Sequence, residues 1–172
     1  MGPTKDIMAT ETAEKLNIGL QEDQRDSVIS KLKQILADQH VLYVKTRNFH
    51  WNLVGERFHS LHEFFEKQYG ELEARIDQTA ERIRMLGGVA SGSMQEFLEH
   101  THLKEAPGDL IEGDDSIAVL VNDYEQSIRI LRDTISEVEE KQHDVGTADF
   151  LTSLLQAHEE AAWMLRSFLK RT

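Results

Sequence analysis

Residues 58–88 read FHSLHEFFEKQYGELEARIDQTAERIRMLGG, and this stretch decides the fold class. Its apolar side chains recur at steps of three, four and seven, which is the spacing of one face of an α-helix. The members of this stripe are Phe58, Leu61, Phe65, Leu72, Ile76, Ile83 and Leu86. Gly87 and Gly88 follow directly and supply a helix stop. The stretch therefore predicts one long amphipathic helix.

Three further segments carry the same period. We expect one helix from Asp26, a candidate N-cap, to about Trp51. Another is expected from Asp115 or Ser116, and the last from Thr147, a candidate cap. Four long amphipathic helices predict an all-α four-helix bundle.

The connection between the second and third long helices is itself structured. Ser93 and Glu96 have the spacing of a capping box, which predicts a short extra helix. This connection is long enough to cross the length of the bundle, which favours a ferritin-like arrangement over a simple up-and-down one. We expect a mobile N-terminal tail over residues 1–25 and the bundle domain over residues 26–172.

Composition limits the kind of protein this is. The 172 residues contain no cysteine, so disulfides and thiolate metal sites are excluded. No apolar run approaches the length of a membrane span, so we expect no membrane partner and a location in the cytoplasm or nucleoid of a bacterium. The net charge of −12 argues against electrostatic affinity for DNA and suits a protein that gathers cations, although such acidity also serves ordinary solubility.

Five side chains carry the candidate chemistry. His50 lies at the end of the first helix, and His62, Glu66, Asp77 and Glu81 lie on the second. At about 100° per residue, the last three fall within ~100° of His62, so all four share one broad face. Imidazoles with carboxylates suit iron, manganese or zinc and do not suit calcium. The alternative is a solvated face with weak pair interactions.

Distance along the helix constrains any such site. Glu66 and Asp77 are eleven positions apart, which is ~16 Å of helix rise. Metal–ligand bonds are only about 2 Å long, so one straight helix cannot bring both pairs to one metal. A second copy running antiparallel would place His62 and Glu66 of one chain against Asp77 and Glu81 of the other. A two-fold dimer with two shared sites follows, provided that the four residues form one centre.

Several short motifs in register resemble the Dps family, the DNA-binding proteins from starved cells. The motifs are Asn48-Phe49-His50-Trp51-Asn52, His62-Glu63, Asp77-Gln78-Thr79-Ala80-Glu81-Arg82, Leu86-Gly87-Gly88 and Thr147-Ala148-Asp149. The likeness covers roughly residues 26–169. It implies a ferritin-like homo-oligomer, a dodecameric hollow shell, with ferroxidase centres at two-fold interfaces.

The resemblance also assigns ligands and chemistry. It implies His50, His62 and Glu66 as iron ligands from one subunit and Asp77 and Glu81 as ligands from its neighbour. Glu66 stands where many members carry aspartate. The implied activity is oxidation of Fe(II) to Fe(III), preferably with hydrogen peroxide, storage of the ferric mineral and protection from oxidative stress. Zinc or manganese are candidate substitutes for iron.

Three more residues enter through the resemblance. Trp51 matches a family tryptophan beside the iron centre, which is implied to accept stray oxidising equivalents; alternatively it is an aromatic that packs at a helix end. Asp144 and Asp149 match an acidic pore for iron entry; alternatively they complement the dipole of the fourth helix.

Other histidines are expected to be decoys. Three pairs have the Glu-x-x-His form of di-iron bundles but lie near helix ends, so we expect them to be exposed: Glu56/His59, Glu99/His102 and Glu140/His143. His59, one turn from His62, is the candidate extra ligand among them. His40 and His158 interrupt apolar stripes, which indicates interface or core positions.

Two rival functions remain open. One is a nucleoid DNA-binding and protecting protein with weak or vestigial ferroxidase activity. The other is a helical assembly protein whose metal site is vestigial. Residues 1–25 carry three basic against five acidic residues, which makes poor phosphate contacts and weighs against DNA binding.

Overall fold

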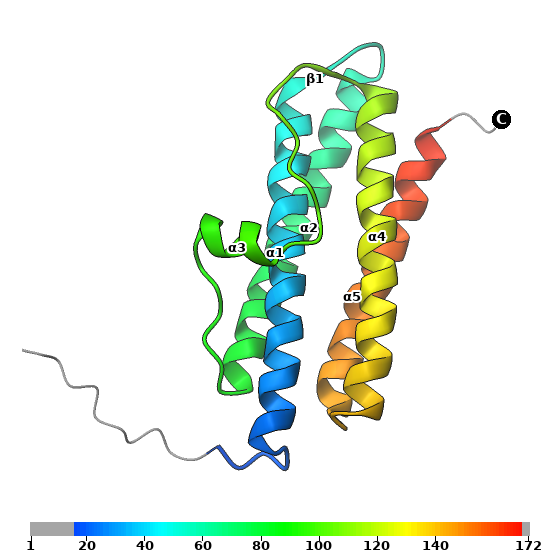
Figure 1. Ribbon diagram of the computed structural model, residues 1–172. Coiled ribbons are helices and arrows are strands. Elements are labelled where there is room, and N and C mark those ends of the chain that lie inside the picture. Colours follow the sequence, from blue (N-terminus) through cyan, green and yellow to red (C-terminus); the bar gives the residue numbers. More distant parts are fainter. Residues whose placement is uncertain (1–15, 170–172) are drawn as a thin grey trace, which may run out of the picture.

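Four long helices form a bundle in the part of the chain that the computed structural model describes, residues 16–169. Their bounds are Glu22–Asn52 for α1, Phe58–Met85 for α2, Gly113–Glu140 for α4 and Val145–Phe168 for α5. Figure 1 shows α1 and α5 running in one direction and α2 and α4 in the other. Because α2 and α4 run the same way, the chain returns along the bundle between them. The predicted all-α four-helix bundle is confirmed.

The start of α1 differs from the prediction. The helix begins at Glu22 with Gln21 as N-cap, so the expected N-cap at Asp26 was wrong. The side chain of Gln24 accepts a hydrogen bond of 2.8 Å from the Gln21 backbone N–H, and Glu22 and Asp23 add favourable negative charge in the first turn. Most of the predicted tail, residues 1–15, lies outside the described residues.

The end of α2 follows the glycine signal in the sequence. Gly88 donates its backbone N–H to the carbonyl of Ile83, and Gly87 donates to that of Arg84. These two bonds form a Schellman motif, which requires a left-handed residue, and Gly87 has a φ of 89°. The motif fixes where the helix that carries Asp77 and Glu81 ends.

The predicted short helix is present as α3, Met94–His100. The Ser93 hydroxyl accepts from the backbone N–H of Glu96, and the Glu96 carboxylate accepts in return from the backbone N–H of Ser93. The capping box read from the sequence is therefore confirmed. Phe97 on α3 is buried and stacks on the ring of His40 in α1, with centroids 3.6 Å apart.

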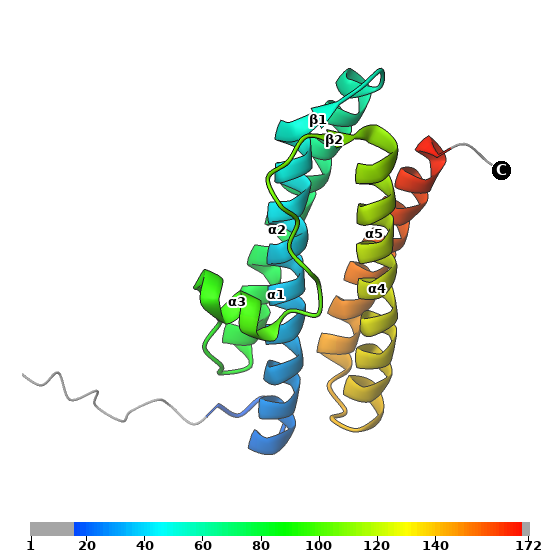
Figure 2. The same cartoon turned by 45° about the horizontal axis from the view of Figure 1, so that its top comes forward.

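After α3, the chain returns along the bundle and is tied to α1. The Asp38 carboxylate accepts from the Thr101 hydroxyl at 2.8 Å and from the His102 backbone N–H at 2.6 Å. The return ends at a strand that pairs in parallel with a strand directly after α1, near the top in Figure 2. These two strands are β1, Leu53–Val54, and β2, Ile111–Glu112. The sequence pattern did not indicate this pairing, because two-residue strands leave no period to detect.

Two helix starts also differ from prediction. The helix α4 begins at Gly113 with Glu112 as N-cap, slightly before the expected Asp115. Asp144, not Thr147, caps α5, and its carboxylate accepts from the Thr147 backbone N–H at 2.9 Å. The predicted cap at Thr147 was therefore wrong, because the acceptor three residues earlier satisfies that N–H.

The apolar core has two parts stacked along the bundle. One is built around Leu32 and Leu151 and the other around Phe65 and Leu165, all of which are fully buried. Burying one such side chain stabilises the fold by roughly 1.5–3 kcal/mol, so these clusters hold the helices together. Between them along α1, α4 and α5 lie buried polar residues, discussed below. No helix within residues 16–169 is long and apolar enough to cross a membrane.

Candidate metal centre

Two histidines from neighbouring helices face each other at one end of the bundle. His50 lies in the last turn of α1 and His62 near the start of α2. Gly55, with a φ of 101°, allows the chain to reverse between the two helices. The imidazole centroids are 3.7 Å apart and the ring planes differ by 16°. The structure therefore brings together the two histidines that the sequence singled out.

Each histidine holds the other in place through its backbone. The Nδ1 atom of His50 lies 2.9 Å from the carbonyl oxygen of His62, and Nδ1 of His62 lies 2.9 Å from the carbonyl oxygen of His50. A carbonyl oxygen only accepts, so Nδ1 carries a hydrogen in both rings. Nε2 is then the nitrogen left for a metal, and the hydrogen bonds of both rings within residues 16–169 are made by Nδ1. This is the tautomer that a metal-binding histidine needs.

Aromatic side chains support the pair on both sides. The ring of Phe58 stacks on His62 at a centroid distance of 5.0 Å. Tyr69 meets His50 edge to face at 5.3 Å. These contacts restrict ring rotation, so the Nε2 lone pairs are oriented before a ligand arrives.

The three carboxylates lie on the exposed side of α2. Glu66, Asp77 and Glu81 are all solvent-exposed, whereas Thr79 and Ile83 between and beyond them are buried. Among the described residues, no three histidine, aspartate or glutamate side chains converge on one point. One chain therefore presents the histidine pair and the Asp77/Glu81 pair as separate groups, as expected from the ~16 Å of helix rise that already separates Glu66 from Asp77.

Trp51 lies beside the histidine pair and is 63% exposed. The Arg47 guanidinium lies 5.0 Å from the centroid of the Trp51 ring, and it also lies within 5.5 Å of the rings of Tyr43 and Tyr69. Sequence reasoning missed Arg47 and Tyr69. The available signal was the spacing of Tyr43, Arg47 and Trp51 at steps of four, which places them on one helix face.

The two aspartates matched to a pore have different surroundings. Asp144 is 4% exposed, and its carboxylate accepts hydrogen bonds from Thr147 and an ion-pair contact of 3.2 Å from Arg82. Its contacts are those of a helix cap, the alternative considered for it. Asp149 is exposed on α5 and is the member of the pair whose carboxylate faces solvent.

The decoy histidines lie where the pattern indicated. The residues of all three Glu-x-x-His pairs are exposed, and the side chain of His59 is 85% exposed. His40 is half-buried under Phe97, and burial lowers its pKa. His158 is buried in the core.

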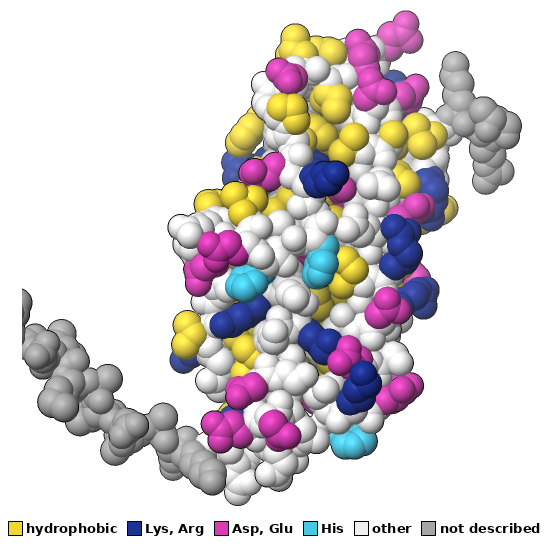
Figure 3. Space-filling view, viewed as in Figure 1, with side chains coloured by type: hydrophobic (Ala, Val, Ile, Leu, Met, Phe, Trp, Pro, Cys, Tyr) yellow, Lys and Arg dark blue, Asp and Glu magenta, His cyan; other side chains and the backbone are white. Residues whose placement is uncertain are grey.

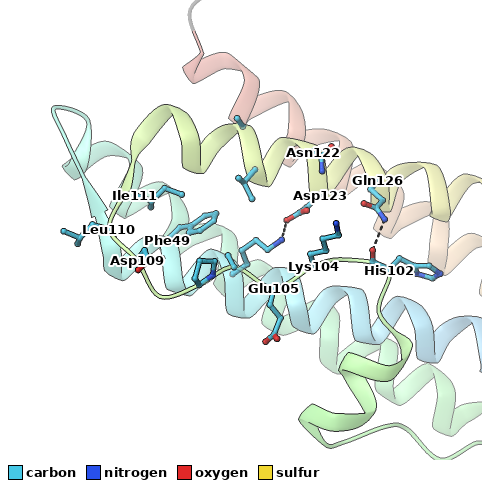
Figure 4. Close-up of a pocket in the computed structure, with 15 residues that line it drawn as sticks. Phe49, His102, Lys104, Glu105, Asp109, Leu110, Ile111, Asn122, Asp123 and Gln126 are labelled. Atoms are coloured by element: carbon cyan, nitrogen blue, oxygen red, sulfur yellow. Dashed lines mark hydrogen bonds and ion pairs between the residues drawn. The ribbon is translucent and has the colours of Figure 1, made fainter.

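A large hollow lies away from the histidine pair. It measures about 770 Å³ and is bounded by α1, α4 and the returning connection (Figure 4). At its base, Lys45 donates to Asp123 at 2.5 Å; burial raises the pKa of Asp123, and Lys45 opposes that shift. None of the five candidate ligands lines this hollow, whose rim includes the 76%-exposed Leu110. In the view of Figure 1, Figure 3 shows hydrophobic side chains gathered in the upper part of the molecule.

Comparison with known proteins connects this geometry to a family. The ferritin-like domain family matches residues 29–172. An uncharacterized low temperature-induced protein of Nostoc sp. is 49% identical over 156 residues, covering 91% of this chain and 87% of that protein. DNA protection during starvation protein 2 of Bacillus anthracis is 38% identical over 145 residues, covering 84% and 97%. The solved Dps structure from Vibrio cholerae O1 superposes with a TM-score of 0.85 at 33% identity, covering 90% and 96%.

The fold and the histidine pair thus define a ferritin-like protein. The Vibrio cholerae structure is described as a member of a broad superfamily of ferritin-like diiron-carboxylate proteins. This chain belongs to the Dps family of that superfamily. The family resemblance and the ferritin-like arrangement expected from the sequence are confirmed.

Proposed function

We propose that this protein is an iron-storage ferroxidase that oxidises Fe(II) with hydrogen peroxide and keeps the ferric product inside a hollow shell of identical subunits, a dodecamer. The observation that carries the proposal is the reciprocal histidine pair, in which both Nδ1 atoms are hydrogen-bonded and neither Nε2 atom has a partner within residues 16–169. Two oriented imidazoles form half of an iron-binding donor set.

The second half of the set comes from another copy. Asp77 and Glu81 are i, i+4 neighbours on the exposed side of α2, so one approaching chain meets both carboxylates together. An antiparallel second copy of α2 brings them to His50, His62 and Glu66 of the first chain. Hard carboxylate oxygens hold the ferric product as well as the ferrous substrate, which suits a site of oxidation.

The proposed reaction balances with two ferrous ions for each molecule of hydrogen peroxide. Two ferrous ions each give one electron to hydrogen peroxide, the O–O bond breaks, and two protons complete two waters. Because both electrons arrive together, no hydroxyl radical is released. Trp51, exposed beside the pair, is placed to accept an oxidising equivalent that escapes this pairing. Asp149 is the carboxylate available for guiding Fe(II) into the shell.

The test is stopped-flow Fe(II) oxidation with peroxide and with dioxygen on the same preparation. The double variant His50→Ala/His62→Ala should lower the rate at least about tenfold, because it removes the oriented nitrogens. His100→Ala is the matched control, since this exposed histidine lies on α3, outside both helices that carry the pair, and its removal should leave the rate unchanged. A double variant that oxidises iron at the wild-type rate would show that the histidine pair is not the centre.

DNA protection is the second candidate, because relatives carry that name. The net charge of −12 weighs against a direct electrostatic contact with phosphates. Protection by removing Fe(II) and peroxide needs no such contact and follows from the ferroxidase activity.

A further inference from the structure

A small cavity lies in the centre of the bundle, between the two apolar clusters of the core. Its volume is about 10 Å³, counted as space open to the centre of a water-sized sphere. Its polar lining comes from three helices: Asp38 and Gln39 on α1, Ser127 on α4 and His158 on α5. Apolar lining residues complete it: Ile35, Ile130 and Leu131.

Three of the four polar side chains around this cavity have no hydrogen-bond partner within residues 16–169. Both amide atoms of Gln39, the hydroxyl of Ser127 and both ring nitrogens of His158 are buried without a hydrogen bond among the described residues. The three residues are 1%, 5% and 3% exposed. A buried polar group without a partner is strongly unfavourable, and native proteins leave few of them. Five such atoms around one void indicate that something fills it.

The charge of the lining decides what the occupant is. Gln39 and Ser127 are neutral, and burial lowers the pKa of His158 to about 3, so its ring is neutral as well. The one acid at the cavity, Asp38, is committed to Thr101 and His102. A divalent iron ion needs carboxylate ligands to offset its desolvation, and this cavity has none free.

Size agrees with a small neutral occupant. About 10–15 Å³ of such space holds one water molecule. A water molecule donates two and accepts two hydrogen bonds, so it can pair with up to four of the five unpaired atoms. Buried waters in proteins make about three such bonds.

We propose that one water molecule is bound between Gln39, Ser127 and His158, and that the interior of this bundle is a neutral hydrated site closed to iron. Di-iron carboxylate bundles can carry glutamates and Glu-x-x-His motifs that project into the core and hold metal there. Here the cavity is lined by an amide, a hydroxyl, a neutral imidazole and the Asp38 carboxylate, which is already hydrogen-bonded to Thr101 and His102. The water links α1 to the α4–α5 hairpin, where the apolar clusters leave a gap.

Crystals of the assembled protein, soaked with cobalt(II) and measured at the cobalt absorption edge, test the occupant directly. We expect one water peak within hydrogen-bonding distance of His158 and of at least one of the other two side chains, with no anomalous signal there. An anomalous peak at this position would show that a metal and not water occupies the cavity, which would overturn the proposal. An empty cavity, or direct hydrogen bonds among the three side chains, would show that no water is bound there and would also overturn the proposal.

Thermal unfolding gives a second, independent test, because the sign of the change in Tm separates a water-bound Ser127 hydroxyl from an unpaired one. If Ser127 binds the water, Ser127→Ala leaves that water short of a partner and lowers Tm by about 2–4 °C. If the hydroxyl is unpaired, the same change relieves an unfavourable group, and Tm stays constant or rises. Ser116→Ala is the control on the same helix, because its buried hydroxyl donates to the Gly113 carbonyl and its removal should lower Tm. An unchanged or higher Tm for Ser127→Ala beside a lower Tm for Ser116→Ala would overturn the proposal.

Discussion

His158 is a titratable side chain in the centre of the bundle. Burial lowers its pKa from 6.5 to about 3, and the positive charge of Arg75 shifts it in the same direction. The ring of Tyr124 packs edge to face against it at 5.3 Å, and Asp38 also lines its cavity. The folded chain therefore keeps this imidazole neutral at pH values where the unfolded chain protonates it.

The sign of the resulting pH dependence is fixed by linkage. Below about pH 6.5 the unfolded state binds a proton at His158 that the folded state does not bind until about pH 3. Stability is therefore lost as pH falls through this window. Relative to His158→Phe, which does not titrate, the wild-type free energy of unfolding should fall by up to ~1.4 kcal/mol per pH unit. Urea unfolding of both proteins at pH 7.5, 6 and 5 measures this, and a constant difference across the series would contradict it.

At the residue scale, the sequence predicted which side chains are candidate ligands, but not the contacts that these side chains make. His50 and His62 were identified from residue type and spacing, because ligands to metals come from few side chains. Their mutual hydrogen bonds were not predictable, since they depend on how closely two helices pack. The cavity around Gln39 and Ser127 had no sequence signal either, because single polar residues in an apolar stripe are common.

At the scale of elements, the end of α2 depends on one glycine. Gly87 adopts a φ of 89°, which costs an L-residue roughly 1–2 kcal/mol, and a Cβ there would lie 3.3 Å from Leu16. Gly87→Ala should therefore lower Tm by roughly 2–8 °C in a calorimetric scan. Gly92→Ala is the control, because a methyl group on Gly92 would meet no atom within 4 Å and its φ is not positive. Equal Tm values for the two variants would show that the Schellman motif is not needed.

The existence of every helix was predictable, whereas several helix ends were not. Apolar periodicity extends over whole helices, so it survives local exceptions. Caps depend on single contacts: Gln24 reaching back to Gln21, and Asp144 held by Arg82 from another helix. The Ser93 capping box was predicted because both of its partners are local in sequence. The start of α5 depends on a tertiary contact with Arg82, whereas the start of α1 was missed because glutamine is not among the preferred N-cap residues.

At the scale of the whole molecule, net charge governs the encounter with DNA. A chain with a net charge of −12 repels a polyanion, and the proposed shell of many copies would multiply that repulsion. Filter binding to duplex DNA near ~150 mM salt should give a dissociation constant weaker than about 1 µM. A tighter constant that weakens steeply with added salt would establish a phosphate-binding surface and favour the DNA-binding alternative.

In the proposed assembly, a ferroxidase centre forms only where two subunits meet. If each centre takes His50 and His62 from one chain and Asp77 and Glu81 from its neighbour, a lesion in one group is complemented by an intact partner. One variant carries His50→Ala/His62→Ala and the other carries Asp77→Asn/Glu81→Gln. Each homogeneous shell should be inactive in stopped-flow Fe(II) oxidation, because every centre lacks one half of its ligands.

Co-expression of the two variants separates a shared centre from one contained in a single chain. In a mixed two-fold pair, one centre receives both histidines and both acids from the intact halves, while the other loses all four. Mixed shells should therefore regain part of the wild-type rate, whereas variants assembled separately and mixed after folding should not. A centre within one bundle predicts no rescue, since every chain carries a lesion. Shells shown by mass spectrometry to be mixed, yet inactive, would place the centre within one chain and leave the exposed Asp77 and Glu81 without a part in it.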